Sequence, residues 1–444
     1  MMIGQFLHST NRNNKLLQPR NYIRKIVTSE LVRNSAKLLS ANVVAQAIGL
    51  LVYPILTRLY SPEDFGLLNV FLSIGGVLAL LSTAEYQYAI VLPKTQNKAV
   101  ACFHVGFFML LAITALCAAS IPFKTQIATL FNAPALTKYY PLLCVFVFVT
   151  GLWTLLNYWF TRNKQFSRIS TYQLTQSISG AGLKYSFGVG GMVNGGLVWS
   201  IIIAPIIAIA ASICRHFRRN IRPLCQYNKH DCRVAAKEYV NFPKYSLPRA
   251  LINNLSGNLP ILLLTPFFGL TEIGYFGMAF TLAFRPINMI SGSLYQVLFQ
   301  RISEQVQNRQ SILPFFRKFV KSTLFIVIPS FAVFSFILPW LTRWLLGPGW
   351  EVTGEYIRWM LPWLCCSLLT ASVCFLSDVF AKQRIGLWFE ILLAVLRTIG
   401  VLAGVLTNSF NVAVVGYAIS SAIAILAQFV WLYALVKKYD SHIN

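Results

Sequence analysis

The sequence predicts an all-α integral membrane protein with about twelve transmembrane helices, arranged as two six-helix lobes. Composition points to a membrane, because 56% of the residues are hydrophobic and only 11% are charged, whereas soluble proteins carry about 25% charged residues. Apolar runs of roughly 20 residues or more recur along the chain, which is the length that an α-helix needs to cross a bilayer. A membrane β-barrel would instead show short segments of alternating hydrophobicity.

Each apolar run gives one predicted membrane span. The first six spans cover approximately residues 38–58, 65–90, 99–121, 139–160, 170–190 and 193–214. The second six cover approximately residues 243–268, 274–299, 319–342, 356–380, 385–406 and 411–436. The polar segment between the sixth and seventh spans is the longest internal one, and it divides the chain into two sets of six.

The division gives a domain organisation. We predict a basic cytoplasmic N-terminal segment (1–37), a first lobe (38–214), a basic cytoplasmic linker (215–242), a second lobe (243–436) and a cytoplasmic tail (437–444). The stretches YPILTRLYSPEDFG and LPILLLTPFFGLTEIG occupy matching places in the two lobes, and in both Pro-Ile-Leu is followed by an acidic turn and a glycine. Six spans return the chain to the same side, so a pseudo-two-fold axis along the membrane normal is expected, with a substrate site between the lobes near the midplane.

Lysine and arginine are concentrated in alternate connections. The connections on one predicted side hold most of the 38 cations, whereas the other side holds only Arg58, Lys124, Lys138, Arg343 and Arg358. This alternation follows the positive-inside rule and predicts that both termini are cytoplasmic. It also accounts for the net charge of +25 through contact with anionic membrane lipids, without a nucleic-acid partner.

A resemblance to a known family starts at the turn between the first two spans. The stretch LTRLYSPEDFGLLNVFLSI, with Pro62-Glu63-Asp64-Phe65-Gly66 in its middle, resembles the start of the polysaccharide repeat-unit flippases of the O-antigen type. These belong to the multidrug/oligosaccharidyl-lipid/polysaccharide (MOP) flippase superfamily, and the layout of twelve spans with a basic central loop is similar over most of the chain.

The resemblance implies a fold like that of the multidrug MATE transporters and a function in the bacterial inner membrane. It implies a transporter, not an enzyme, that moves an undecaprenyl-pyrophosphate-linked oligosaccharide from the cytoplasmic to the periplasmic leaflet by alternating access. Other membrane proteins of polysaccharide assembly are expected partners on the same ground.

Three cations lie deep within predicted spans: Lys184, Arg285 and Arg397. An arginine at mid-bilayer costs about 2.5–3.5 kcal/mol on insertion scales, so such residues have partners or a function. Arg285 and Arg397 are expected near the midplane, and Lys184 in the outer half of its span. One interpretation is a cationic cavity that binds an anionic headgroup, since the arginine fork matches phosphate oxygens. The other is structural pairing with a buried acid, and for Lys184 snorkelling to the interface.

Amides and prolines suggest further parts of the pathway. The seventh span carries Asn253, Asn254 and Asn258, and the first span carries Asn42 and Gln46 at i, i+4; we predict that they line the cavity. Hydrogen bonds between helices are the alternative. The candidate hinge residues are Pro260 and Pro286, since proline removes a helix hydrogen bond and bends the backbone.

The source of energy is less well defined by the sequence. Glu85, Asp378 and Glu390 are acids within or at the ends of spans, and they are candidates for proton or sodium coupling or for charge partners of the buried cations. No P-loop occurs, and no cofactor is expected. The nine cysteines fit no zinc spacing, so no metal site is predicted, and free thiols are expected in a reducing compartment.

Two other functions remain open. A drug or small-molecule extruder of the same superfamily would be expected to carry more buried acid than buried base, which is the opposite of the pattern here. A membrane polysaccharide polymerase or ligase would be expected to carry a sizeable periplasmic loop, and the longest outer connections here, around 122–138 and 343–355, are short.

Overall fold

A computed structural model describes residues 30–214, 222–380 and 382–443, and they form helices and turns without a strand. Residues 1–29 of the predicted N-terminal segment lie outside this part, and residues 30–37 belong to the first described helix. The helices before the central linker are α2 (Glu30–Leu51), α3 (Tyr53–Leu56), α4 (Pro62–Ser82), α5 (Gln96–Ala119), α6 (Lys124–Leu130), α7 (Leu136–Arg162), α8 (Phe166–Val189) and α9 (Val193–Cys214). The linker itself contains α11 (Lys229–Glu238). The helices after it are α12 (Leu247–Leu264), α13 (Leu270–Gln307), α14 (Leu313–Leu346), α15 (Glu351–Val373), α16 (Leu376–Val379), α17 (Gln383–Leu406) and α18 (Phe410–Ile443).

Each predicted span falls on one of these helices or on a consecutive pair, which confirms the predicted fold class. By length and apolarity alone, eight helices of the described residues could cross a membrane: α4, α5, α7, α9, α14, α15 with α16, α17 and α18. The other four predicted spans fall on α2 with α3, α8, α12 and α13. Those helices are less apolar because they carry the amides and cations that face internal cavities, as described below.

The second predicted span, residues 65–90, was wrong at its C-terminal end. The helix α4 ends at Ser82, because Ala84 and Glu85 adopt left-handed backbone angles, with φ of 47° and 63°. A 3₁₀ turn, η1 (Tyr86–Ile90), follows. The apolar run continues past the helix because the turn is itself buried against α5 and α7.

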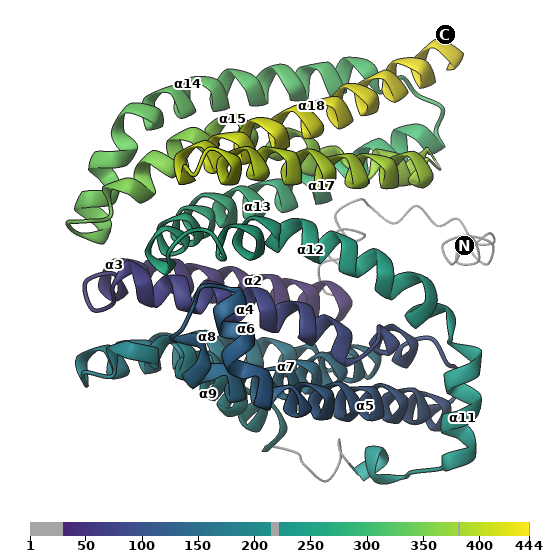
Figure 1. The fold of residues 1–444 in the computed structure, drawn as a ribbon. Helices are drawn as coiled ribbons and strands as arrows, with labels where there is room; N and C mark the ends of the chain where they lie inside the picture. Colours follow the sequence, from purple (N-terminus) through teal and green to yellow (C-terminus); the bar gives the residue numbers. More distant parts are fainter. Residues whose placement is uncertain (1–29, 215–221, 381, 444) are drawn as a thin grey trace, which may run out of the picture.

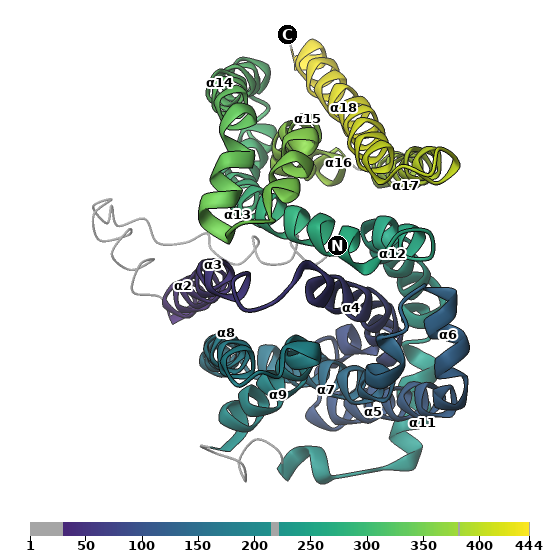
Figure 2. The same cartoon turned by 60° about the vertical axis from the view of Figure 1, so that its left-hand side comes forward.

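The helices form two groups that meet along α4, α12 and α13. In Figure 1, helices α2 to α9 make up the lower half and α14, α15, α17 and α18 the upper half, with α12 and α13 between them. Figure 2 shows the same separation from a second direction. Contacts of α4 with α13 and with α12 join the groups, so the halves are held together mainly through three helices.

The PEDFG turn forms the start of α4 by a capping box. The Ser61 hydroxyl accepts a hydrogen bond from the backbone N–H of Asp64, and the Asp64 carboxylate accepts one from the backbone N–H of Ser61. Pro62 occupies the first helical position, where its missing N–H has no helical partner to lose. The motif thereby fixes where α4 begins, next to α13.

The glycines of the two repeated stretches pack against each other's helices. A Cβ on Gly66 of α4 would collide with the carbonyl oxygen of Leu270 in α13, and a Cβ on Gly274 of α13 would collide with the carbonyl oxygen of Pro62 in α4. Gly66 lies four residues after Pro62, and Gly274 lies four residues after Leu270. In each helix, therefore, the glycine follows by four positions the residue whose carbonyl oxygen faces the other helix's glycine. The contact is therefore reciprocal, as a two-fold relation between the halves requires, and only glycine permits it.

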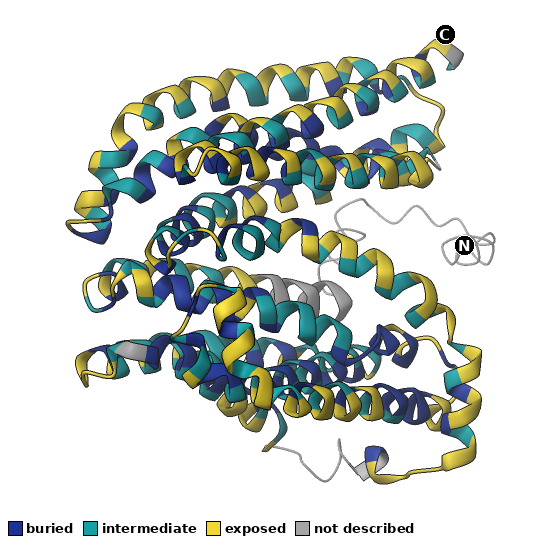
Figure 3. Ribbon diagram, in the orientation of Figure 1, coloured by how far each residue is buried: buried dark blue, intermediate teal, exposed yellow. Residues whose placement is uncertain are grey.

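The outer face of the second half is strongly apolar. Figure 3 shows exposed residues along the whole length of α14, and Phe325 and Phe336 are 81% and 86% exposed. A soluble protein rarely presents such a surface, and it suits contact with lipid chains. The chain is a multi-pass membrane protein, and α14 lies at its periphery.

The predicted linker and tail are partly helical. In the linker, α11 packs against α5 with Cys232 and Ala235 buried, and a salt bridge of 3.3 Å joins Lys98 to Glu238. The predicted tail, 437–444, continues α18 as far as Ile443. The tail residue Asp440 accepts hydrogen bonds from the backbone N–H groups at the start of α14. The domain boundaries themselves stay predictions.

Candidate functional site

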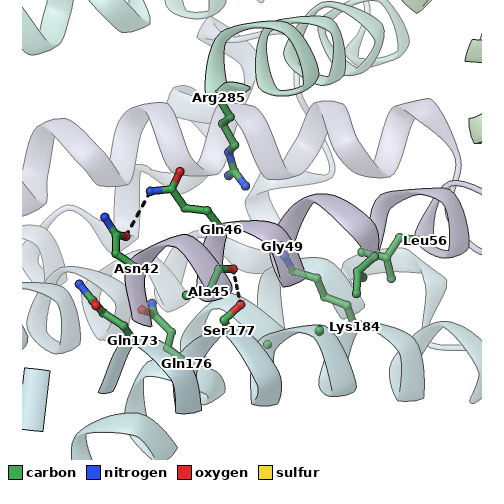
Figure 4. A pocket seen from close by; sticks show the side chains of 13 residues that line it. Asn42, Ala45, Gln46, Gly49, Leu56, Gln173, Gln176, Ser177, Lys184 and Arg285 are labelled. Atoms are coloured by element: carbon green, nitrogen blue, oxygen red, sulfur yellow. Dashed lines mark hydrogen bonds between the residues drawn. The ribbon is translucent and has the colours of Figure 1, made fainter. Parts of the chain in front are cut away.

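A cavity of about 380 Å³ lies between α2 and α8 of the first half and α13 of the second (Figure 4). We call it the cationic pocket. Its lining residues are Asn42, Ala45, Gln46, Gly49, Val52, Leu56, Gln173, Gln176, Ser177, Gly180, Ala181, Lys184 and Arg285. The volume lies within the range of about 300–1,000 Å³ that is usual for ligand sites.

Helical spacing places the polar side chains on this pocket. On α8 the lining residues recur three or four positions apart, which puts them on one face of the helix. The Ser177 hydroxyl donates to the carbonyl oxygen of Ala45 at 2.7 Å and ties α8 to α2. The Gln46 amide donates to the Asn42 side chain at 3.1 Å, so these two amides form one polar unit (Figure 4).

Arg285 and Lys184 provide the charge of the pocket. Figure 4 shows Arg285 pointing from α13 into the space beside α2, while Lys184 comes from α8. Gly49 of α2 lies next to the guanidinium, since a Cβ at this position would make an ordinary contact of 3.5 Å with Nη1 of Arg285. The Arg285 guanidinium carbon also lies 6.0 Å from the centre of the Tyr53 ring, which is within the range of a cation–π contact.

The pocket has no acidic lining residue among the described residues. The two salt bridges of the described residues, Lys98–Glu238 and Arg343–Glu351, lie elsewhere. The charges of Lys184 and Arg285 repel each other, and without a carboxylate between them the pocket attracts an anion. The side-chain oxygen of Gln173 is buried without a hydrogen-bond partner, so it is also available to a ligand.

Arg397 is not part of this pocket. It is 8% exposed within the second half, where its guanidinium donates to the hydroxyls of Ser421 at 3.0 Å and Ser256 at 3.4 Å. The rings of Trp363 and Tyr417 lie 5.8 and 5.2 Å from its guanidinium carbon. These four partners are neutral and come from three helices, α12, α15 and α18. A substrate contact by Arg397 stays a prediction.

The three acids predicted as coupling or pairing residues line a second cavity of about 630 Å³. We call it the acidic cavity, and it is lined by Leu80, Glu85, Tyr88, Ser246, Arg249, Ala250, Ile252, Asn253, Asn254, Cys374, Ser377, Asp378, Gln383, Gly386, Leu387, Glu390 and Gln428. The structure thus brings Glu85, Asp378 and Glu390 together from distant parts of the chain. Among the described residues, however, no three acidic, histidine or cysteine side chains are close enough to hold a metal ion.

Glu85 is the most buried of these acids, at 3% exposure. Arg249 of α12 attracts its carboxylate electrostatically. Glu390 likewise attracts Arg397, although no ion pair joins these two within the described chain. The acidic cavity therefore mixes three carboxylates with one cation, whereas the cationic pocket has two cations and no carboxylate.

The polar residues of the seventh span divide between two surroundings. Asn253 and Asn254 line the acidic cavity. Asn258 instead donates to the backbone and side-chain oxygens of Asn254, and its own side-chain oxygen accepts a bond of 3.4 Å from Ser73 of α4. For Asn258 the structure favours the helix–helix alternative.

The candidate hinge prolines both lie inside helices. Pro260 is in α12 and Pro286 is in α13, directly after Arg285. A π-helical turn, η4 (Phe242–Ser246), also precedes α12, and such turns often occur at functional sites. Whether the chain bends at these points stays a prediction.

Three site residues were not identified from the sequence: Gln173, Gln176 and Arg249. The two glutamines were detectable, since they share a helical stripe with Lys184. Arg249 lies near the start of the predicted seventh span, where a cation is expected at the cytoplasmic side of the membrane. Its place in the acidic cavity depends on the tertiary fold, which brings residues of α12, η1 and α17 around one space and which no local pattern encodes.

Comparison with known proteins agrees with this architecture. No curated protein sequence matches the chain. Among solved structures, an inward-facing multidrug resistance MATE family transporter of the MOP superfamily aligns with a TM-score of 0.70 and 13% identity, over 89% of this chain and 96% of its own. The lipid II flippase MurJ in an inward closed conformation aligns with a TM-score of 0.68 and 14% identity, over 91% and 90%.

A third similar structure is a MOP superfamily transporter from Pyrococcus furiosus, with a TM-score of 0.53 and 12% identity over 92% of this chain and 95% of its own. At these identities the likeness shows a common fold. The sequence family described as polysaccharide biosynthesis protein matches residues 55–354, which is more than half of the chain. This protein therefore belongs to the polysaccharide biosynthesis protein family, and it has the fold of the MOP superfamily.

Proposed function

We propose that this protein is a flippase for an undecaprenyl-pyrophosphate-linked oligosaccharide, such as an O-antigen repeat unit. It moves this lipid from the cytoplasmic to the periplasmic leaflet of the bacterial inner membrane. The observation that carries the proposal is the cationic pocket, in which Lys184 and Arg285 line one space that no described acid lines. Membership of the polysaccharide biosynthesis family supports the substrate class.

The pocket chemistry suits a pyrophosphate with attached sugars. The planar guanidinium of Arg285 can bind two phosphate oxygens at once, and the ammonium of Lys184 adds a second point charge. Charge-assisted hydrogen bonds contribute about 1.5–3 kcal/mol each, which is enough to compensate for holding the cations inside the membrane. The amides of Asn42, Gln46 and Gln173 then serve sugar hydroxyls next to the pyrophosphate.

The position of the pocket suits alternating access. It lies between helices of both halves, so a relative movement of the halves would open or close it. The reciprocal contact of Gly66 and Gly274 holds the starts of α4 and α13 together. The Trp350 ring nitrogen also donates to the Thr57 carbonyl oxygen at 3.2 Å near this end. With both termini in the cytoplasm, this closed end faces the periplasm.

The acidic cavity is our candidate for energy coupling. Binding of a proton or a sodium ion near Glu85, Asp378 and Glu390 would change the net charge beside Arg249 and Arg397. Such a change could favour one arrangement of α12 and α17 over another. We propose transport without a catalytic step, and other membrane proteins of polysaccharide assembly as partners.

A multidrug extruder is the alternative that the MATE likeness supports. The charge of the cationic pocket distinguishes the two functions, because two unpaired cations repel a cationic drug and attract a pyrophosphate. Binding of cationic drugs in preference to a lipid pyrophosphate would therefore favour the alternative.

The proposal is tested with purified protein in liposomes that carry the lipid-linked oligosaccharide extracted from host cells lacking this protein. Wild-type protein should move the sugar to the outer face, where an added glycosidase can remove it. Arg285→Ala should lower the rate at least about tenfold, since loss of one charge-assisted bond exceeds 1.4 kcal/mol. Arg285→Lys should recover part of the rate, because it keeps the charge and loses the fork.

Arg343→Ala is the matched control, since Arg343 is exposed and paired with Glu351, and it should transport at the wild-type rate. Equal rates for wild type and Arg285→Ala would contradict the cationic-pocket mechanism. The same liposomes, with the proton or sodium gradient abolished, test coupling. A transport rate that is independent of both gradients would rule out the coupling proposal but would not contradict flipping.

A further inference from the structure

A third cavity, also of about 380 Å³, lies on the other side of α8, among α4, α7, α8 and α9. We call it the aromatic pocket, because the rings of Trp153 and Tyr172 line it. It shares three wall residues with the cationic pocket: Gln176, Gly180 and Lys184. These lie four residues apart on α8 and form one stripe, so the two pockets adjoin along that helix.

Gly180 stands in the middle of the shared wall. A Cβ at this position would meet only Ala204 Cβ, at 3.5 Å, which is an ordinary contact. Because Gly180 has no side chain, no side chain separates the two pockets at this position, between the flanking Gln176 and Lys184. A ligand bound beside Lys184 can extend past Gly180 toward the aromatic rings.

The aromatic pocket offers hydrogen-bonding groups that the protein does not use. Threonine in a membrane helix usually bonds a carbonyl oxygen one turn earlier, as Thr154 does to Thr150 at 2.9 Å. The hydroxyl of Thr150 itself has no such bond, and neither it nor the Gln176 amide is hydrogen-bonded to any other described residue. Polar groups left unpaired inside a membrane protein are costly unless water or a ligand satisfies them.

The rings supply the second feature. Trp153 and Tyr172 are stacked, with ring centres 3.3 Å apart and planes at 7°, and Phe146 lines the same cavity. Sugar rings have apolar C–H faces and polar hydroxyl edges, so they need aromatic surface together with amide and hydroxyl partners. A polyprenyl chain would need the apolar surface only, and an additional phosphate would need a cation beyond Lys184.

We propose that the aromatic pocket is the subsite for uncharged sugar residues of the lipid-linked substrate, beside the cationic pocket that holds its pyrophosphate. The inference rests on the proposed flippase function and deepens it. Lys184 lies at the junction, where it contacts the pyrophosphate. Gln176 and Thr150 bond sugar hydroxyls, and Trp153 packs against a sugar face.

The test compares two ligands on purified full-length protein. One is undecaprenyl pyrophosphate, which carries no sugar. The other is the undecaprenyl-pyrophosphate-linked oligosaccharide extracted from host cells lacking this protein. The measured quantity is the ratio of their dissociation constants. For wild type, the oligosaccharide should bind at least about tenfold more tightly, which a few hydrogen bonds and one ring contact readily supply.

Gly180→Leu places a side chain in the shared wall and should reduce this ratio to about one. The matched control is Gly182→Leu, on the same helix, where a Cβ would meet nothing within 4 Å and which lines neither pocket; its ratio should equal that of wild type. Thr150→Val removes only an unpaired hydroxyl, so it should fold normally and reduce the ratio about threefold to tenfold.

Two other outcomes for the variants would overturn the inference. An equal loss of affinity for both ligands in Gly180→Leu assigns the aromatic pocket to the polyprenyl chain. Unchanged ratios in Gly180→Leu and Thr150→Val place the sugars elsewhere. Failure of wild type to bind even undecaprenyl pyrophosphate would instead contradict the proposed function, so the two failures are distinguishable.

Discussion

Arg285 and Arg397 show how differently one residue type is used at similar predicted depth. Arg285 points into a cavity, has one ring nearby and lacks an acidic partner in the described chain. Arg397 is enclosed by two hydroxyls and two rings. The first arrangement leaves the guanidinium available to a ligand. The second uses the guanidinium to connect α17 with α12, α15 and α18.

The difference predicts a stability effect for Arg397. Arg397→Ala should lower the free energy of unfolding by about 2–4 kcal/mol, because it removes two hydrogen bonds and two ring contacts from a buried position. Thermal unfolding of the purified protein measures this loss. If the variant instead has normal stability and binds undecaprenyl pyrophosphate more weakly, Arg397 contacts the substrate.

Sequence alone could identify the deep cations but could not separate them. Lys184, Arg285 and Arg397 were found because charge is rare within spans. The rotation of each helix about its axis, which decides whether a side chain meets a cavity or a neighbouring helix, depends on tertiary packing. A buried cation predicts an acidic partner, whereas the structure gives Arg397 serines and aromatic rings. Such residues are too common in spans to be recognised as partners from the sequence.

At the scale of helices, the start of α4 combines two requirements in one short motif. Ser61, Pro62 and Asp64 set the first turn through the capping box, and Gly66 lets α13 approach main chain to main chain. The corresponding stretch of α13 supplies Gly274 for the same purpose. The motif thus both begins the helix and joins the halves.

Because of this contact, we predict that even a methyl group at position 274 destabilises the protein. Gly274→Ala should destabilise the protein by about 1–3 kcal/mol, the usual range for overpacking, because its Cβ would collide with the Pro62 carbonyl oxygen. Gly292→Ala, on the same helix with nothing within 4 Å of its Cβ, should be neutral or slightly stabilising. Melting temperatures of the two variants in detergent provide the comparison. Equal melting temperatures would show that the helices adjust without strain.

The helices themselves were largely predictable, since long apolar runs leave few alternatives within a membrane. The end of α4 was not, because the left-handed residues Ala84 and Glu85 end it inside a run that is still apolar. The polarity of α8 was the missed signal. Its glutamines recur at helical spacing with Lys184, which indicates a helix that faces a cavity and not lipid.

At the scale of the whole molecule, the distribution of charge predicts which side faces the cytoplasm. Cys225 in the linker is exposed, whereas Cys232 is buried in α11, and burial raises the pKa of the Cys232 thiol. In a Cys214→Ser background, a membrane-impermeant maleimide should label Cys225 only after the inner membrane is permeabilised. Cys232 should stay unmodified at neutral pH, because its thiol is shielded and protonated.

A control for this labelling comes from the opposite side. Gln126→Cys in α6, an exposed position, should be labelled in cells whose inner membrane is intact. Labelling of Cys225 before permeabilisation would reverse the predicted orientation and with it the direction of transport.

The reciprocal glycine contact also bears on how such a protein can diversify. Main-chain atoms of α4 meet main-chain atoms of α13 there. The contact therefore does not depend on the side chains that the other faces of these helices carry. Substitutions that refit the pockets to a new sugar can therefore accumulate on α8 and α13 while the two halves keep their mutual alignment. Substrate choice and mechanical integrity become separable traits, and selection can alter one without disturbing the other.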